Sequence, residues 1–407
     1  MKVNVFKTIA AALMGALILA SCEPTVPTCS GLIGINITGL PDVPAPDSYT
    51  ITITNVGTTE VTTIESPSPL ISVMDLAPGT YDITVKAVTS KGGSAYILTG
   101  SASSVVFTGG DFGSIYVDLT AVKSSALIMK EIHYNATKTL PNEQGKTSTY
   151  LKDTFFELYN NGDETVYLDG VCLGNALSST TFDFSAQQDK LSHPVSEYVF
   201  METYVWRIPG SGKQYPLAPG ESAIISASAI DHSLVANAPS HVTAEFETIC
   251  QKYIDKGQTD ANAINLELAC TIKASGLANQ FGVFVGEAWV LFYPSEPLRA
   301  DGQYLESNKA NNYGQEVLIA DVLDAVDLKK NAAAEKQLVD ALDMGSIWCA
   351  TTGGNQSIVR KVSGEKDGRK IYQDTNNTTD DFEVVEGPEL RRNGAKRPSW
   401  STWTTAQ

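Results

Sequence analysis

The chain has 407 residues, of which 43% are hydrophobic, so it is long enough to bury more than one apolar core. Lys and Arg contribute 29 residues against 46 Asp and Glu, which gives a formal net charge of −17. A surface this acidic repels the phosphates of nucleic acid, and we therefore expect no nucleic-acid partner.

The first residues have the layout of a bacterial lipoprotein signal. Lys2 and Lys7 precede an apolar run from Ile9 to Ala20, and the sequence Leu-Ala-Ser-Cys ends at Cys22. The run is too short to span a bilayer permanently, which indicates that residues 1–21 are a removable export signal. We expect Cys22 to become an acylated N-terminus that holds the chain to a membrane outside the cytoplasm. The alternative is an ordinary secretory signal with a chance cysteine.

Cysteine spacing argues against a zinc site. None of the cysteines forms a Cys-x-x-Cys pair, so we expect no structural metal and no cofactor. An exported protein can pair some of its cysteines, and buried reduced thiols are the other interpretation; both stay open. The remaining cysteines are Cys29, Cys172, Cys250, Cys270 and Cys349.

Residues 22–30 are rich in Pro and Thr, which is typical of an extended tether. Residues 31–122 then carry several short runs in which apolar and polar residues alternate, separated by Gly and Pro pairs. Alternation with a period of two places one face of a strand in a core and the other in water. The pattern predicts a β-sandwich of roughly seven to eight strands.

The tetrapeptide Leu-Ala-Pro-Gly occurs at residues 76–79 and again at residues 217–220. Pro presets one dihedral angle of a tight turn and Gly adopts the left-handed conformation that follows. We therefore expect positive φ at Gly79 and Gly220, with each turn leading into a strand. The first copy resembles a turn of prealbumin-like and immunoglobulin-like modules in secreted bacterial proteins.

A second β unit is expected over residues 123–390. Its sequence contains Glu-Ile-His-Tyr-Asn at residues 131–135 and Phe-Phe-Glu-Leu-Tyr-Asn at residues 155–160. Val-Tyr-Leu-Asp-Gly follows at residues 166–170. The intervening Asn-Asn-Gly-Asp predicts a hairpin between the last two runs.

The order of these motifs, followed by Leu-Ala-Pro-Gly, resembles the lamin-tail domain, an immunoglobulin-like β-sandwich. Residues 322–326, 357–361 and 373–382 also resemble its closing strands and terminal loop. The whole arrangement is similar to uncharacterised lipoproteins of gut-type Bacteroidota that carry a domain of unknown function. The resemblance implies an all-β chain of two sandwich domains, and it implies little about activity.

An insert over about residues 231–310 departs from the lamin-tail pattern. Within it, residues 244–256 have helical spacing and predict an amphipathic helix, whereas residues 283–293 predict a strand. Residues 332–342 favour a second short helix. The basic tail, residues 391–407, is expected to be loose or lightly docked.

The four histidines form no metal-binding motif. His133 falls in a predicted strand and is expected to be a core or edge residue with a satisfied hydrogen bond. His232 and His241 fall in a polar loop of the insert and are expected to be exposed, and His193 belongs to no motif. The nucleophile elbow and the phosphate-binding loop are also missing, so no catalytic residue is predicted.

Two groups of aspartates deserve comparison with calcium sites. Oxygen-rich loops suit Ca²⁺, but the calcium-loop pattern is missing, and we expect caps and turns instead. The groups are Asp321, Asp324 and Asp327, and Asp374, Asp380 and Asp381.

Aromatic residues alternate at Tyr198, Phe200, Tyr204 and Trp206. This spacing suits either a display of rings for sugars or apolar ligands, or one buried face of a sandwich strand. We expect the buried face.

Two functional hypotheses follow. The first is a membrane-anchored extracytoplasmic lipoprotein without enzymatic activity, which binds or assembles. By family analogy it would serve outer-membrane nutrient uptake beside an outer-membrane protein, on the periplasmic or the cell-surface side. The alternative is a secreted hydrolase with its site in the insert at residues 231–310.

Overall fold

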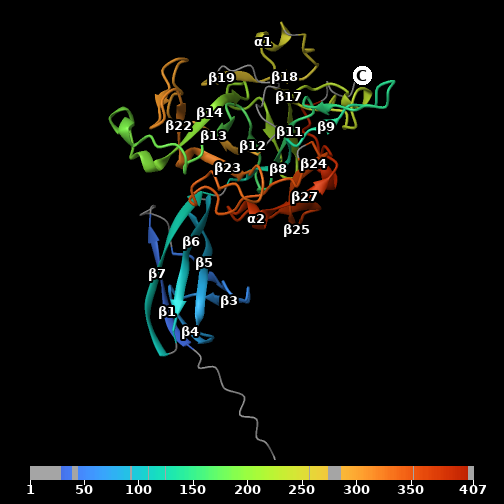
Figure 1. Ribbon diagram of the computed structural model, residues 1–407. Coiled ribbons are helices and arrows are strands. Elements are labelled where there is room, and N and C mark those ends of the chain that lie inside the picture. The colour runs from blue at the N-terminus through green and yellow to red at the C-terminus, as the bar shows by residue number, and fades with distance from the viewer. Residues whose placement is uncertain are drawn as a thin grey trace, which may run out of the picture.

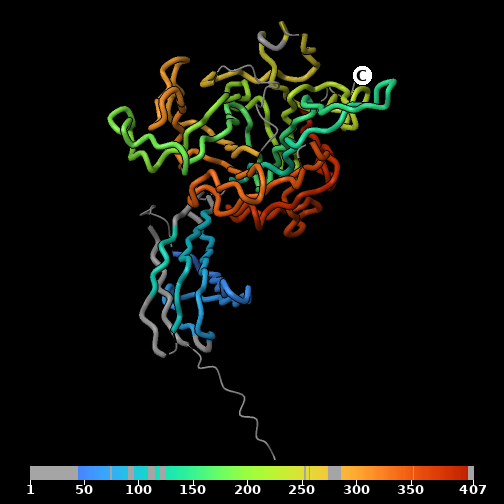
Figure 2. Tube along the Cα trace, viewed as in Figure 1, coloured from blue at the N-terminus to red at the C-terminus, as the bar shows by residue number. Residues whose placement is uncertain are grey.

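The computed structural model describes residues 29–38, 45–91, 94–108, 110–123, 125–255, 257–273, 286–351 and 353–401. These residues form a smaller unit of long strands and a larger unit of shorter strands (Figure 1 and Figure 2). The predicted all-β class is confirmed. None of the helices in these segments has the length and apolar character that a bilayer crossing requires. The predicted signal, Cys22 and the tether up to residue 28 lie outside the described residues.

The smaller unit is a seven-stranded sheet in the order β3-β2-β5-β6-β7-β1-β4. Neighbouring strands are antiparallel except β1 and β7, which are parallel. Side chains of β2 and of β4, near opposite ends of this order, share one apolar core, so the sheet curls around that core. The strands are β1 (Cys29–Thr38), β2 (Tyr49–Asn55), β3 (Val61–Ser66), β4 (Leu70–Leu76), β5 (Gly79–Lys91), β6 (Ser94–Phe107) and β7 (Gly110–Lys123).

Strand β2 confirms the predicted alternation, because its apolar residues are buried and the threonines between them are half-buried. The prediction for Gly79 is wrong. Gly79 pairs with Phe107 as the first residue of β5 and has no positive φ. The turn before it is held instead by the Tyr81 hydroxyl, which donates to the carbonyl of Ala77 at 2.7 Å. Gly220 has the predicted positive φ, 81°.

Strand pairing shows which end of the smaller unit meets the larger one. Thr38, the last residue of β1, pairs with Thr120 of β7. Thr120 pairs in turn with Thr99 of β6, which pairs with Lys86 of β5. The ammonium of Lys86 lies 2.8 Å from a carboxylate oxygen of Asp380 in the larger unit. Strand β1 therefore starts at the remote end and runs towards the larger unit, as Figure 1 also shows.

The larger unit is built on two sheets. One, which we call the β11 sheet, has the order β18-β17-β16-β11-β8-β24-β27. The other, the β14 sheet, has the order β21-β22-β14-β13-β20-β23, with β19 also paired to β14. The strands of the β11 sheet are β8 (Leu127–His133), β11 (Phe155–Asn160), β16 (Ser222–Ser226), β17 (Phe246–Glu247), β18 (Ile264–Asn265), β24 (Gln356–Arg360) and β27 (Phe382–Glu386). Those of the β14 sheet are β13 (Cys172–Ala176), β14 (Tyr198–Arg207), β19 (Glu267–Thr271), β20 (Ala288–Phe292), β21 (Leu305–Glu306), β22 (Tyr313–Leu318) and β23 (Val322–Asp327).

The two sheets face each other across the main apolar core of the larger unit. Phe156 of β11 lies against Trp289 of β20, with ring centroids 4.8 Å apart. Three two-stranded ribbons and several short helices connect and cover the sheets. These are β9 (Thr137–Lys138) with β10 (Thr149–Tyr150), β12 (Val166–Tyr167) with β15 (Pro216–Leu217), β25 (Val362–Lys366) with β26 (Arg369–Tyr372), α1 (Gln251–Ile254), α2 (Thr378–Asp381), and the 3-10 helices η1 (Ser185–Lys190), η2 (Val195–Glu197), η3 (His232–Leu234), η4 (Ile319–Asp321) and η5 (Arg392–Gly394).

The predicted hairpin at Asn-Asn-Gly-Asp does not form. Strand β11 pairs with β8 and β16, while β12 pairs with β15. The Asn160 side-chain amide donates to the carbonyls of Glu164 and Leu217, both at 2.7 Å, and its oxygen accepts from the backbone N–H of Gly162. These bonds fix the loop as a connection from the β11 sheet to the β12–β15 ribbon, so the motif forms a turn but not a hairpin.

The predicted insert lies within both sheets. Residues 231–310 supply β17 and β18 to the β11 sheet, and β19, β20 and β21 to the β14 sheet. Strand β20 confirms the later part of the strand predicted over residues 283–293, whose first residues lie outside the described segments. The helix predicted over residues 244–256 is reduced to the four residues of α1, because residues 246–247 form β17 instead.

The helix predicted over residues 332–342 is also wrong. The carboxylate of Asp327 accepts the backbone N–H groups of Gln337 and Leu338 at 2.6 and 2.7 Å, which holds this segment in an irregular path. The side chains of Leu338 and Leu342 fill the core on the outer side of the β14 sheet. Tertiary contacts here outweigh the helical propensity of the alanines.

The C-terminal segment is docked rather than loose as far as residue 401. The guanidinium of Arg391 bonds Glu245, and Arg392 donates to Glu131 at 3.0 Å. The indole of Trp400 donates to the carbonyl of Pro216 at 2.6 Å. Buried carboxylates on or beside the β11 sheet thus bind the basic residues of the tail. The composition of the tail alone does not reveal these partners.

Candidate functional site

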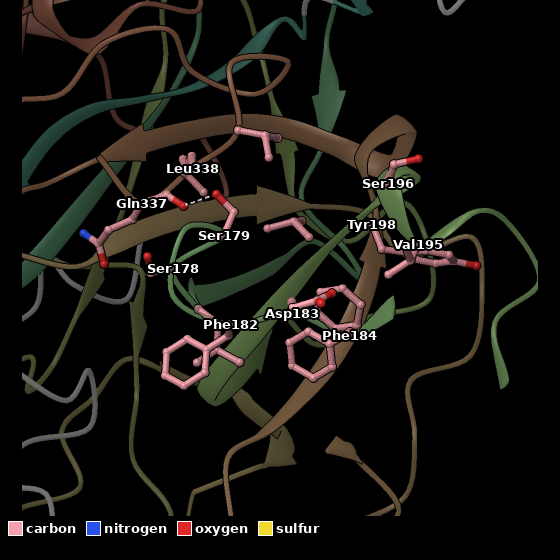
Figure 3. A pocket seen from close by; sticks show the side chains of 14 residues that line it. Ser178, Ser179, Phe182, Asp183, Phe184, Val195, Ser196, Tyr198, Gln337 and Leu338 are labelled. Carbon is pink, nitrogen blue, oxygen red and sulfur yellow. Dashed lines mark hydrogen bonds between the residues drawn. The ribbon is translucent and has the colours of Figure 1, made fainter. Parts of the chain in front are cut away.

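A cavity of about 300 Å³ lies where β14 meets the segment around η1 and η2. Its floor is apolar and buried, and its rim combines polar with apolar residues (Figure 3). The floor residues are Leu177, Phe184, Tyr198, Phe200 and Leu338, and the polar rim residues are Ser178, Ser179, Asp183, Ser196 and Gln337.

Close packing shapes the floor of this cavity. The rings of Phe184 and Phe200 are stacked, with centroids 3.8 Å apart and planes 9° apart. They lie against the backbone of Gly314, where an added Cβ would come within 2.9 Å of Phe184 and 3.1 Å of Leu177. The absent side chain at Gly314 therefore leaves room beside β22 for the Phe184 ring and for the Cβ of Phe200.

Two loops from distant parts of the chain form the rim. The backbone N–H and the hydroxyl of Ser179 both donate to the carbonyl of Gln337, at 2.8 and 2.7 Å. Asp183 accepts from the backbone N–H and the hydroxyl of Ser185, and these bonds lower the pKa of its exposed carboxyl. The rim is thus tied across the cavity and carries an ionised carboxylate at neutral pH.

The alternating aromatics predicted on one strand face do share a face of β14, in two groups. Tyr204 and Trp206 lie in the core between the two sheets. Tyr198 and Phe200 lie beyond that core and line the cavity. The expected buried strand face is confirmed, because all four rings are at most 8% exposed.

The face of the β11 sheet that points away from the main apolar core is polar yet buried. A bulge in β8 shifts the register between Met129 and Glu131, so that Lys130 and Glu131 both face away from the main core. Lys130 lies 2.8 Å from Glu157, and both side chains are fully buried. Glu245 joins them through the tail arginines. We call Lys130, Glu131, Glu157 and Glu245 the buried polar layer.

Three of the four histidines gather at one end of this layer. His133 is buried and hydrogen-bonded, as predicted, to the carbonyl of Gln356 at 3.1 Å and to Asp153 at 3.3 Å. The prediction that His232 and His241 are exposed is wrong, because both are fully buried, with ring centroids 4.4 Å apart. The loop that carries them folds back over the sheet.

Hydrogen-bond partners assign the tautomers of this pair. The Nε2 of His232 faces the carbonyl of Ser228 and must donate, so its Nδ1 accepts from the Tyr150 hydroxyl at 2.7 Å. The Ser226 hydroxyl donates to the carbonyl of Ser228, so the Nδ1 of His241 donates to Ser226. Burial lowers the pKa of both imidazoles, and for His241 the neighbouring histidines add to this effect. Both rings are therefore neutral at neutral pH.

The aspartates compared with calcium loops serve as caps and ion-pair partners. Asp324, Asp374 and Asp381 surround the buried guanidinium of Arg360 at 2.7, 3.0 and 3.6 Å. Asp321 accepts from the backbone N–H and the hydroxyl of Ser295, both at 2.8 Å. Asp380 bonds Lys86 across the two units, and Asp327 binds backbone groups as described above.

Within the described segments, no three His, Cys, Asp or Glu side chains are grouped so that they could hold a metal ion. Among the cysteines whose side chains the structure describes, Cys172, Cys250, Cys270 and Cys349 are free thiols. Of the two interpretations of these four, the reduced thiol is the one observed. Burial raises the pKa of Cys172 to about 11, which keeps its sulfur protonated.

The known proteins that this chain resembles are themselves of unknown function. Residues 218–389 match the family model described as "Protein of unknown function (DUF4876)". The crystal structure of a DUF4876 family protein from Bacteroides thetaiotaomicron is similar, with a TM-score of 0.60 and 27% sequence identity. The match covers 91% of this chain and 99% of that one. No curated protein matches the chain.

Proposed function

We propose that this protein is an extracytoplasmic lipoprotein, held to a membrane by acyl chains on Cys22, whose two β units bind or assemble rather than catalyse. The lipoprotein signal at residues 1–22 supports the anchor. Within this proposal the larger unit is a lamin-tail-like, immunoglobulin-like module. Its partner is an outer-membrane protein of nutrient uptake, on the periplasmic or the cell-surface side.

The direction of β1 is the observation that carries the proposal. Strand β1 starts only seven positions after Cys22, at the end of the smaller unit remote from the Lys86–Asp380 contact. Its ten residues span about 30 Å at the usual rise of about 3.3 Å per residue. An anchor at Cys22 would thus make the smaller unit a spacer that holds the larger unit away from the membrane.

The described acid and base groups at residues 232–247 lend the hydrolase alternative no support. His232 and His241 are buried, and His232 bonds protein groups through both nitrogens. Glu245 and Glu247 are buried as well and accept from backbone N–H groups. A hydrolase needs an acid or a base within reach of a substrate, and these groups lie beneath covering loops.

Replacing the lipid-bearing residue tests the anchor. We expect Cys22→Ala to shift the protein from the detergent phase to the aqueous phase in Triton X-114 partition, because the acyl chains are lost. Cys29→Ala is the matched control, since Cys29 lies outside the lipoprotein motif, and it should leave partition unchanged. Detergent-phase recovery of the Cys22→Ala protein would contradict the proposed anchor.

A further inference from the structure

The cavity beside β14 has the form of a small-molecule site. Its apolar floor is set by the stacked Phe184 and Phe200 rings, and its rim is tied by Ser179 and Gln337. Its 300 Å³ correspond to roughly ten water molecules at about 30 Å³ each. Sites for small ligands start at about this size and share this pattern of an apolar lining with few polar groups.

Charge restricts what this cavity can hold. Asp183 is the only charged residue among those that line it, and its lowered pKa keeps it ionised. The whole chain has a net charge of −17. An anionic ligand would therefore meet a like charge at the rim and find no cation among the lining residues.

The shape of the lining favours a ring. Phe182, Phe184, Tyr198 and Phe200 contribute four aromatic side chains to one cavity. Aromatic pairs in offset or edge-to-face geometry attract each other beyond the effect of their buried area. At the rim, the Ser196 hydroxyl can bond a neutral polar substituent. The Ser178 hydroxyl already donates to Thr181 and also contacts Thr180, so towards a ligand it can only accept.

We propose that this cavity binds an uncharged aromatic small molecule, with its ring on the Phe184–Phe200 floor and its polar end at the serine rim. This inference rests on the binding role proposed above, and it gives that role a ligand class. Its test does not involve the membrane anchor, so the two proposals can fail separately.

Two fluorescent probes that differ by one charge test the ligand class. N-phenyl-1-naphthylamine is neutral, and 8-anilinonaphthalene-1-sulfonate carries the same rings with a sulfonate. Titrations use the full chain with Cys22→Ala, so that no acyl chains compete for the probes. We expect saturable binding of the neutral probe and at least tenfold weaker binding of the anionic one. No saturable binding of the neutral probe, or equal binding of both, would overturn the proposal.

A variant at the mouth locates the binding. Val339 lines the cavity and is 37% exposed, so Val339→Trp fills the mouth without entering the core. We expect at least a tenfold loss of neutral-probe affinity with unchanged thermal unfolding. Val235→Trp, at a position 47% exposed on the loop over the buried polar layer, is the matched control and should bind like the parent protein. Undiminished binding by the Val339 variant would place the probe elsewhere and overturn the assignment.

Discussion

Strand β2 of the smaller unit and strand β11 of the larger unit both carry polar side chains among apolar ones, but their surroundings differ. In β2 the polar Thr52 is half-buried at the surface of the sheet. In β11 every residue is buried, including Glu157. An alternating pattern thus places a polar residue on the second face of a sheet, but it does not reveal whether water or protein covers that face.

Covering segments make the difference. The outer face of the β11 sheet lies under the C-terminal segment and under the loop that carries His232 and His241. A covered polar face is stable only if each charge finds a partner, and Lys130, Arg391 and Arg392 provide partners for its carboxylates. The smaller unit needs no such pairing where its polar side chains meet solvent.

Removing one buried charge should produce the largest effect. Glu157→Gln keeps the shape of the side chain but leaves the fully buried Lys130 without its ion-pair partner. We expect a loss of about 3–5 kcal/mol in the free energy of unfolding of the larger unit. All five tryptophans of the chain lie in that unit or beyond it, so tryptophan fluorescence in urea follows its unfolding specifically.

Two further variants complete this comparison. Thr52→Ala in β2 should cost no more than about 1 kcal/mol, measured by far-UV circular dichroism. Lys130→Met combined with Glu157→Gln should regain most of the lost stability, because no unpaired charge remains. Equal losses for Glu157→Gln and Thr52→Ala would contradict the distinction between the two faces.

The strands were predictable from sequence where one face meets water, and the motifs of the larger unit marked its central strands. The runs at residues 131–135 and 155–160 do lie in or beside β8 and β11. The cavity was not predictable, because residues 178–200 meet residues 337–339 only through the fold. The burial of His232 and His241 was not predictable for the same reason. The polar sequence of their loop predicts exposure, and only the fold shows which surface the loop covers.

The two copies of Leu-Ala-Pro-Gly allow a second, smaller contrast. Gly220 has a φ of 81°, and an added Cβ would come within 2.9 Å of the Arg369 side chain, whereas Gly79 is extended. We expect Gly220→Ala to destabilise the larger unit by about 1–2 kcal/mol, which tryptophan fluorescence in urea should detect. Gly79→Ala should change the unfolding of the smaller unit by less than about 1 kcal/mol. A larger loss of stability for Gly79→Ala than for Gly220→Ala would contradict this difference in backbone conformation between the two glycines.

The covered face of the β11 sheet should also make the free energy of unfolding depend on pH. We expect this effect to be smaller and more gradual than the effects of the substitutions above. The folded-state pKa of His241 is lowered by burial, whereas in the unfolded chain it returns to about 6.5. Below that pH, His241 binds a proton in the unfolded state but not in the folded state. The free energy of unfolding therefore falls as the pH decreases, by up to about 1.4 kcal/mol per pH unit for one group. Burial raises the pKa of Asp343 to about 6, which acts in the opposite direction, so the profile of the wild type alone is not diagnostic.

The difference between variants isolates the histidine. His241→Asn retains a donor to Ser226 but does not titrate, so its stability should fall less steeply than that of the wild type between pH 6.5 and 5. Parallel profiles for His241→Asn and the wild type would show that water reaches His241, and the polar face of the β11 sheet would then resemble that of β2 after all.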